Sequence, residues 1–151
     1  MFTKILYPTD FSDSAGKALR YINQLREAGS QEVVLLHVIN QRIVDGLMRH
    51  GTLEDDIVRW KSKVKENALE SLEEIRKSLE EMGYTVKCMV KTGYPRQVIL
   101  DVEKIETPSI IVMGSHGRSN LGDMLLGSVS DRVVRRSIAP VLVVKRDRVG
   151  D

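Results

Sequence analysis

Four small residues toward the C-terminal end of the chain have a spacing suited to holding phosphate groups. Gly114 and Gly117 lie three positions apart, and Gly127 and Ser128 follow after nine further residues, giving the pattern G-x2-G-x9-G-S. Glycine lets the backbone approach a ligand closely, and the free amides at the start of a helix carry partial positive charge that favours anions. The pattern therefore predicts a site for the phosphates of a ligand.

A second polar stretch follows the first apolar run of the chain. The run Lys4–Tyr7 is followed by Pro8-Thr9-Asp10, and the G-x2-G pattern follows another apolar run, Ser109–Met113. Short apolar runs alternate with longer amphipathic segments along the chain, which is typical of strand–helix units in a parallel sheet. Because the carboxyl ends of parallel strands lie at one edge of the sheet, we expect the two polar stretches to meet there.

The predicted fold is α/β, an open parallel five-stranded sheet with helices on both faces. Two strand orders, 2-1-3-4-5 and 3-2-1-4-5, are compatible with right-handed crossovers. The third run alternates apolar and polar residues, as an edge strand does, and so favours 3-2-1-4-5, in which the first and fourth strands are neighbours. The predicted strands are Lys4–Tyr7, Glu32–Val38, Thr85–Lys91, Ser109–Met113 and Pro140–Lys145.

The segments between the strands carry apolar residues at helical spacing. The segment from Asn40 to Thr52 is the exception: we expect it to be irregular or to form one helical turn, with hinges at Gly46 and Gly51, and it could cover a ligand bound nearby. Helices are predicted from Ser12 to just before Gly29, from Leu53 to Met82, from Pro95 onward and after Gly127.

Two common nucleotide-binding classes do not match these residues. A P-loop needs Gly-Lys followed by Ser or Thr, and the one Gly-Lys pair, Gly16-Lys17, lies inside a predicted helix. A dinucleotide fingerprint needs G-x-G-x-x-G after the first strand, where this chain has Pro-Thr-Asp-Phe-Ser. Ser115 and His116 invite a hydrolase interpretation, but adjacent side chains are expected to point different ways and no acid is placed to orient the imidazole.

The composition of the chain excludes further functional classes. The chain has 151 residues and a formal net charge of +2, which predicts one domain spanning residues 1–151 and no broad basic face for nucleic acid or an anionic membrane. Its single cysteine, Cys88, indicates a reducing compartment, and no apolar run is long enough for a transmembrane helix or signal peptide. We therefore expect a cytoplasmic protein.

With these residues in view, the chain resembles the ATP-binding branch of the universal stress protein family, whose motif is G-x2-G-x9-G-[ST] after the fourth strand. The resemblance covers essentially the whole chain, and it implies the fold of that family, which is similar to the adenine nucleotide alpha hydrolases and related to the flavodoxins. Further similar segments are Pro8–Ser12, His37-Val38, Gly93-Tyr94-Pro95 and Ala139–Val144.

The resemblance also implies a ligand and the residues that hold it. Adenine would lie near Thr9, Asp10 and Val38, the ribose and phosphates along Met113–Gly117, and the phosphate tail at Gly127–Ser130, with Mg²⁺ bridging the phosphates. No protein ligand of the metal is assigned. The implied partner is a second copy bound through the last strand, Val141–Val144. The candidate nucleotide-binding residues are Pro8, Thr9, Asp10, Val38, Met113, Gly114, His116, Gly117, Arg118, Gly127, Ser128, Val129 and Ser130.

Some residues keep a second interpretation. Ser128 with Asp131 fits a capping box, so its hydroxyl could cap the helix while only backbone amides meet the phosphate. Asp10 could be a turn or cap residue. We expect bulkier residues at Gly114 and Gly127 to abolish nucleotide binding and leave the fold intact.

The function expected is that of a nucleotide-dependent switch or sensor in the stress response, not a metabolic enzyme, with at most slow ATP hydrolysis or autophosphorylation. The alternatives are an adenylate-handling enzyme of similar fold and a nucleotide-independent dimeric interaction module.

Overall fold

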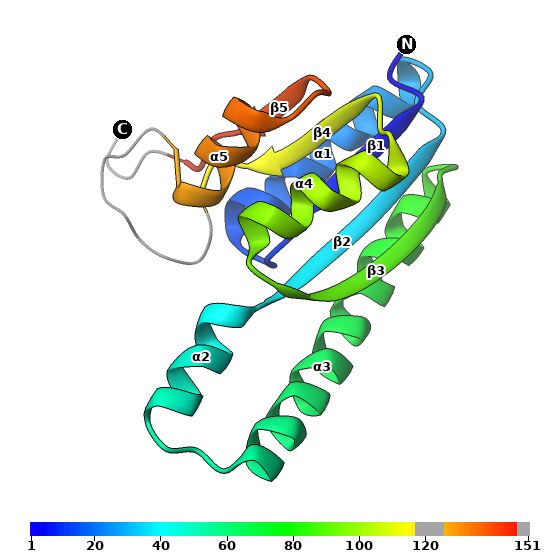
Figure 1. Ribbon diagram of the computed structural model, residues 1–151. Helices are drawn as coiled ribbons and strands as arrows, with labels where there is room; N and C mark the ends of the chain where they lie inside the picture. Colours follow the sequence, from blue (N-terminus) through cyan, green and yellow to red (C-terminus); the bar gives the residue numbers. More distant parts are fainter. Residues whose placement is uncertain (117–125, 148–151) are drawn as a thin grey trace.

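A parallel sheet in the order β3-β2-β1-β4-β5 forms the centre of the molecule, as predicted. The computed structural model describes residues 1–116 and 126–147 (Figure 1). Each pair of neighbouring strands is parallel. The strands are β1 (Lys4–Pro8), β2 (Glu32–Asn40), β3 (Thr85–Gly93), β4 (Ile110–Gly114) and β5 (Val141–Val144).

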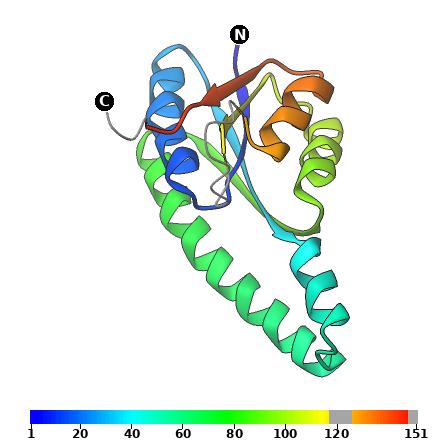
Figure 2. The same ribbon diagram turned by 90° about the vertical axis from the view of Figure 1, so that its left-hand side faces the viewer.

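Helices cover both faces of this sheet. Figure 2 shows α1 and α3 on one side of the strands and α4 and α5 on the other. None of the helices in the described ranges is long and apolar enough to cross a membrane. The helices are α1 (Asp13–Glu27), α2 (Gln41–Arg49), α3 (Glu54–Glu81), α4 (Pro95–Glu106) and α5 (Ser128–Arg136).

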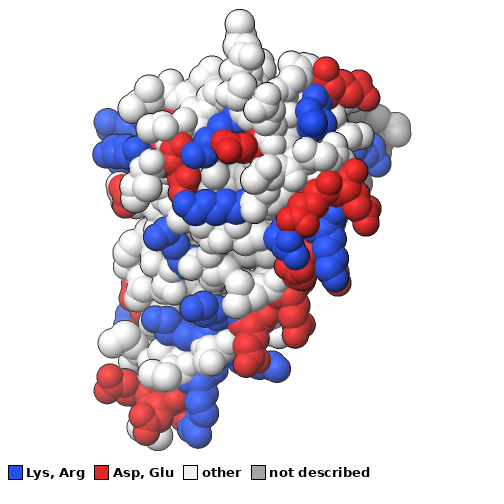
Figure 3. Space-filling view, turned by 90° about the vertical axis from the view of Figure 1, so that its right-hand side faces the viewer, with Lys and Arg blue, Asp and Glu red and all other residues white. Residues whose placement is uncertain are grey.

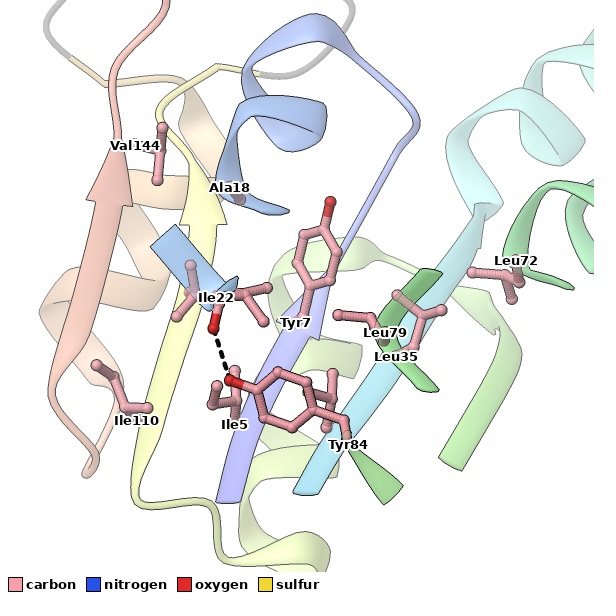
Figure 4. Close-up of a cluster of buried hydrophobic side chains, with 12 residues drawn as sticks. Ile5, Tyr7, Ala18, Ile22, Leu35, Leu72, Leu79, Tyr84, Ile110 and Val144 are labelled. Atoms are coloured by element: carbon pink, nitrogen blue, oxygen red, sulfur yellow. Dashed lines mark hydrogen bonds between the residues drawn. The ribbon is translucent and has the colours of Figure 1, made fainter. Parts of the chain in front are cut away.

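The alternation of side chains along the strands divides the core into two clusters. On β1, Ile5 and Tyr7 face α1 and α3, whereas Leu6 faces α4 and α5. In the first cluster the buried hydroxyl of Tyr84 donates to the carbonyl oxygen of Ile22 on α1 at 2.6 Å, so its polar atom is satisfied (Figure 4). Both faces of the central strands are therefore apolar, as a sheet covered on both sides requires.

The open edge at β3 carries lysines, as an edge strand often does. Lys87 on this strand and Lys4 on β1 both donate to the carboxylate of Glu106, at 2.5 and 3.1 Å. These two hydrogen bonds lower the pKa of Glu106, whose side chain is only 7% exposed. Figure 3, which looks at the molecule from the right of Figure 1, shows Lys and Arg interspersed with Asp and Glu on this face.

The prediction for the segment from Asn40 to Thr52 was wrong. Nine residues form the regular helix α2, and Gly46 lies inside it. The side chain of Asn40 accepts a hydrogen bond from the amide of Arg42 at 3.0 Å and caps the helix, while Val44 is buried. Gly51, with a φ of +79°, does occupy the turn before α3. Residues 41–64, the α2–α3 arm, project beyond the carboxyl edge of the sheet (Figure 1).

Candidate nucleotide-binding site

A pocket of about 780 Å³ lies at the carboxyl ends of β1, β2 and β4. This volume is within the range of small-molecule sites, roughly 300–1,000 Å³. Gly117 and Arg118 lie outside the described residues. Every other predicted site residue lines this one pocket: Pro8, Thr9, Asp10, Val38, Met113, Gly114, His116, Gly127, Ser128, Val129 and Ser130.

The end of β1 is shaped by a tight turn. Thr9 Oγ1 accepts from the amide of Phe11 at 3.1 Å, and Asp10 Oδ1 accepts from the amide of Ser12 at 3.0 Å. Asp10 is therefore a turn residue and lines the pocket as well, so both interpretations of it fit the structure. Phe11 adopts a left-handed φ of +64°, a strained conformation for a bulky residue and one that tends to occur at functional sites.

His37 supports this turn from β2. Its Nδ1 lies 2.8 Å from the carbonyl oxygen of Thr9, and its ring stacks on Phe11 with centroids 4.5 Å apart. His37 therefore has a structural role in holding this turn.

Helix α1 begins in close contact with the end of β4. The hydroxyl of Ser12 accepts from the amide of Ala15 at 3.4 Å and caps the helix, as predicted. Ser14 Oγ donates to the carbonyl oxygen of His116 at 2.6 Å. A Cβ at Gly114 would lie 2.5 Å from Ser14 Oγ and 2.8 Å from the backbone nitrogen of Ala15. Gly114 is thus closely packed against α1, and this contact argues against the expectation that a larger residue there leaves the fold unperturbed.

Ser115 and His116 differ from their predicted arrangement. Ser115 Oγ lies 2.9 Å from His116 Nδ1, so the two side chains meet although they are adjacent in sequence. Ser115 is 1% exposed, and its hydroxyl also accepts from the amide of Arg146 at 3.3 Å, a link to the chain after β5. This burial keeps the hydroxyl away from any substrate in the pocket, so the pair does not form a hydrolase nucleophile.

The start of α5 presents amide donors that have no partner among the described residues. The N-cap is Gly127, whose amide donates to the carbonyl oxygen of Ser115 at 2.7 Å. Ser128 is the first helical residue and makes no capping hydrogen bond, so the capping-box interpretation was wrong. Ser130 Oγ instead donates to the carbonyl oxygen of Ser115 at 2.5 Å. The amides of Ser128, Val129 and Ser130 have no acceptor within the described part of the chain.

Comparison with known proteins agrees with this architecture. The model of the universal stress protein family matches residues 1–145. The chain belongs to the universal stress protein family. Universal stress protein MJ0577 of Methanocaldococcus jannaschii is 40% identical over 156 residues, which cover 97% of this chain and 96% of that protein. Universal stress protein YxiE of Bacillus subtilis is 34% identical over 148 residues, covering 96% of this chain and all of that protein.

Solved structures of this family share the fold. A structure of MJ0577 superposes with a TM-score of 0.89 at 41% identity and covers 98% of this chain and 99% of that one. A universal stress protein from Arabidopsis thaliana with AMP bound gives a TM-score of 0.64 at 21% identity, covering 98% of this chain and 94% of that one. At this lower identity the likeness shows the fold alone.

In this universal stress protein, α2 lines the pocket, and the segment from Asn40 to Thr52 was expected to cover a ligand, but the individual residues on this side were not predicted. Arg42 could be found only by recognising α2 as a helix that starts beside the sheet edge. Arg96 had a signal, since it follows Pro95 at a predicted helix start, but its charge was not interpreted. The additional residues on this side of the pocket are Arg42, Ile43, Trp60, Val64, Asn67, Ser71, Tyr94 and Arg96.

The residues present fit a nucleotide. The open amides of α5 suit phosphate oxygens, and Val38 and Met113 provide apolar walls. Among the described residues there is no group of three or more His, Cys, Asp or Glu side chains that could hold a metal ion.

Proposed function

We propose that this protein binds ATP at the carboxyl edge of its sheet and acts as a nucleotide-dependent switch or sensor in the stress response. The observation that carries the proposal is that the amides of Ser128, Val129 and Ser130, which have no acceptor among the described residues, lie at the same pocket as the predicted adenine residues. Such amides, aided by the helix dipole, form an anion site. The AMP bound to a family member of the same fold supports the choice of an adenine nucleotide.

In this proposal adenine lies beside Thr9, Asp10 and Val38, and Met113 and Gly114 follow the ribose. His116 lines the same wall. Gly127–Ser130 hold the phosphates, together with Gly117 and Arg118, and Mg²⁺ bridges the phosphate oxygens. The sheet and its helices act as one domain, residues 1–151, in the cytoplasm.

A switch fits this pocket better than a metabolic enzyme does. Phosphoryl transfer needs a positioned nucleophile, metal ligands and charge stabilisers. The one serine beside a histidine, Ser115, is buried, and the carboxylate of Asp10 is engaged in a turn. We therefore propose that hydrolysis or autophosphorylation, where it occurs, is slow. Turnover at ordinary enzyme rates, about 1–1,000 s⁻¹, would favour an adenylate-handling enzyme instead.

Thermal denaturation with ATP and Mg²⁺ tests the binding. A ligand at 100 times its Kd stabilises the folded state by about 2.7 kcal/mol, which raises the melting temperature of a chain this size by roughly 5–10 °C. The absence of a shift at millimolar ATP would refute the proposal and favour the nucleotide-independent interaction module.

Ser128→Pro tests the amides themselves. Proline is well suited to the first position of a helix, and Gly127 before it is extended (ψ 166°), so the substitution removes one open amide and preserves α5. We expect ATP to raise the melting temperature of Ser128→Pro clearly less than that of the wild type. Ser128→Ala is the matched control, since it removes the hydroxyl and keeps the amide, and its shift should match that of the wild type. An unchanged shift in Ser128→Pro would mean that this amide does not meet the ligand.

We also propose a homodimer formed through β5. This strand is the free edge opposite β3, and Val141, Leu142 and Val143 are only half-buried. An apolar edge without charges is a template for pairing with another strand. Light scattering should return a dimer at micromolar concentration, and Val143→Lys should shift it toward monomer. A wild-type monomer would contradict the proposal.

A further inference from the structure

The first turn of α2 lies directly beyond the end of the pocket that is proposed to hold adenine. Val38 on β2 is two residues before Asn40, the N-cap of α2, and at the rise of a strand this separates them by only about 7 Å. Ile43, the third residue of the helix, lines the pocket, whereas the next residue, Val44, is buried. Ile43 is also 52% exposed, so apolar surface of this residue borders the pocket at its adenine end.

A hydrogen bond fastens α2 to the turn before α4. Strands β2 and β3 pair as far as Asn40 and Gly93, so Tyr94, the residue after β3, comes beside the start of α2. Tyr94 Oη donates to Asp45 Oδ2 at 2.5 Å, and Gln41 Nε2 donates to Asp45 Oδ1 at 3.0 Å. The hydrogen bonds from Gln41 and Tyr94 lower the pKa of Asp45, so its carboxylate is ionised at neutral pH and the bond from Tyr94 is charge-assisted.

This hydrogen bond is the main polar restraint on α2. Within residues 1–116 and 126–147, no other side chain of α2 is hydrogen-bonded outside the helix and its cap at Asn40. Val44 is the one buried residue of the helix, which projects from the sheet edge as part of the α2–α3 arm (Figure 1). The Tyr94–Asp45 bond therefore fixes where the first turn of α2 lies relative to the pocket.

We propose that the first turn of α2 closes the adenine end of the pocket, with Ile43 against the base and with Asp45 and Tyr94 as the positioning residues that hold the helix there. The inference rests on the proposed function and deepens it, since it names a binding residue outside the sheet edge. A base beside Val38 covers apolar surface of Ile43 that is otherwise exposed, which favours binding. The phosphates lie at the start of α5, so α2 makes the same contact with ATP and with AMP.

Isothermal titration calorimetry with ATP and with AMP, both in excess Mg²⁺, tests the contact with the base. Ile43→Ala removes three carbon atoms from the partly covered side chain and should weaken the binding of both nucleotides about fivefold. Met48→Ala is the matched control, because Met48 is an exposed apolar residue of the same helix outside the pocket lining, and its affinities should equal those of the wild type. Unchanged affinities in Ile43→Ala, a loss confined to ATP, or an equal loss in Met48→Ala would overturn the inference.

Tyr94→Phe tests the positioning role. The substitution keeps the ring, which lines the pocket, and removes the hydroxyl, so ATP and AMP should both bind about threefold more weakly. Tyr21→Phe is its control, since Tyr21 on α1 is similarly exposed and lies outside the pocket lining. In the Ile43→Ala background Tyr94→Phe should cause little further loss, because the contact that it positions is already gone. Fully additive losses, or wild-type affinity in Tyr94→Phe, would contradict the role of this bond.

Amide hydrogen exchange measures the closure itself. Saturating ATP should slow the exchange of the α2 amides in the wild type, and Tyr94→Phe should speed their exchange in the free protein. If calorimetry shows that the wild type binds ATP but the exchange of α2 does not respond, the inference is refuted and the proposed function stands. If the wild type binds neither nucleotide, the proposed function fails as well, so the two failures are distinguishable.

Discussion

Gly114→Ala is expected to destabilise the fold, although it adds only a methyl group. The new Cβ would lie 2.5 Å from Ser14 Oγ, 2.8 Å from the nitrogen of Ala15 and 2.9 Å from the carbonyl carbon of Ser14. Carbon atoms in favourable contact lie about 3.5–4.0 Å from their neighbours. Two of the three crowded atoms belong to the backbone of α1, so no side-chain rotation relieves the clash, and either β4 or α1 must move.

The magnitude follows from the cost of overpacking. Inserting a methyl group into a well-packed region costs about 1–3 kcal/mol. For a chain of this size each kcal/mol lowers the melting temperature by about 2–4 °C, so we expect a fall of roughly 2–12 °C. Ser14→Ala in the Gly114→Ala background should restore only part of it, because it removes the hydroxyl contact and leaves the two backbone contacts.

Gly16→Ala provides the control on the same helix. No atom lies within 4 Å of a Cβ at this position, which is exposed and within α1. Alanine favours a helix over glycine by about 0.5–1 kcal/mol, so this variant should melt higher than the wild type. Thermal and urea denaturation of the wild type, the two Gly114→Ala variants and Gly16→Ala measures the loss of stability at Gly114 and the gain at Gly16. A Gly114→Ala protein as stable as the wild type would refute the close approach of α1 to β4.

Two further predictions concern titratable groups. Glu106→Gln should lower the free energy of unfolding by about 1 kcal/mol at pH 7, since solvent screens the exposed Lys87 partner. Because the pKa of Glu106 is lowered from 4.5, the stabilisation by its carboxylate is present above pH 4.5 and is lost as the pH falls through the folded pKa. Urea denaturation should therefore separate the variant from the wild type most at pH 7, and the difference should narrow as the pH falls below 4.5. Burial raises the pKa of Tyr7 from 10.0 to about 12, and its hydroxyl donates to the carbonyl oxygen of Ala15 at 2.5 Å. The folded state holds this proton after the unfolded chain has lost it, so stability should fall between pH 10 and pH 12, and Tyr7→Phe should remove this part of the fall; an unchanged slope would contradict the buried hydroxyl.

Strand order could be predicted because it depends on patterns that a sequence displays directly. The edge position of β3 followed from Lys87 and Lys91 alternating with Val86, Cys88 and Val90, and the other strands are apolar on both faces. The candidate site could be located for a related reason. In a parallel sheet the residue after each strand falls at one edge, so Asp10 and Gly114 had to lie at the same edge once the order was known.

The errors arose where tertiary contacts decide the local structure. Helix α2 is short and contains Gly46, and it is stabilised by the Asn40 cap and the burial of Val44. One cap and one buried side chain do not produce a repeating apolar pattern that a sequence could reveal. Ser128 was predicted as the N-cap of α5 but is its first helical residue, because a serine with an acidic residue three positions later fits either place. Ser115 and His116 meet because the backbone bends after β4, where Ser14 holds the carbonyl of His116.

The distribution of charge explains how an almost neutral protein offers a site to a polyanion. The 23 basic residues nearly balance the 21 acidic ones, and the face in Figure 3 mixes both signs. The donors at Ser128–Ser130 are backbone amides, which add nothing to that balance and respond only weakly to salt compared with surface charges. Among the described residues, Arg42 and Arg96 are the basic side chains, apart from histidines, that line the pocket. Because most of the proposed donors are uncharged amides, raising the salt concentration should weaken ATP binding only modestly when it is followed by calorimetry, and a steep loss would argue that side-chain charge carries the binding.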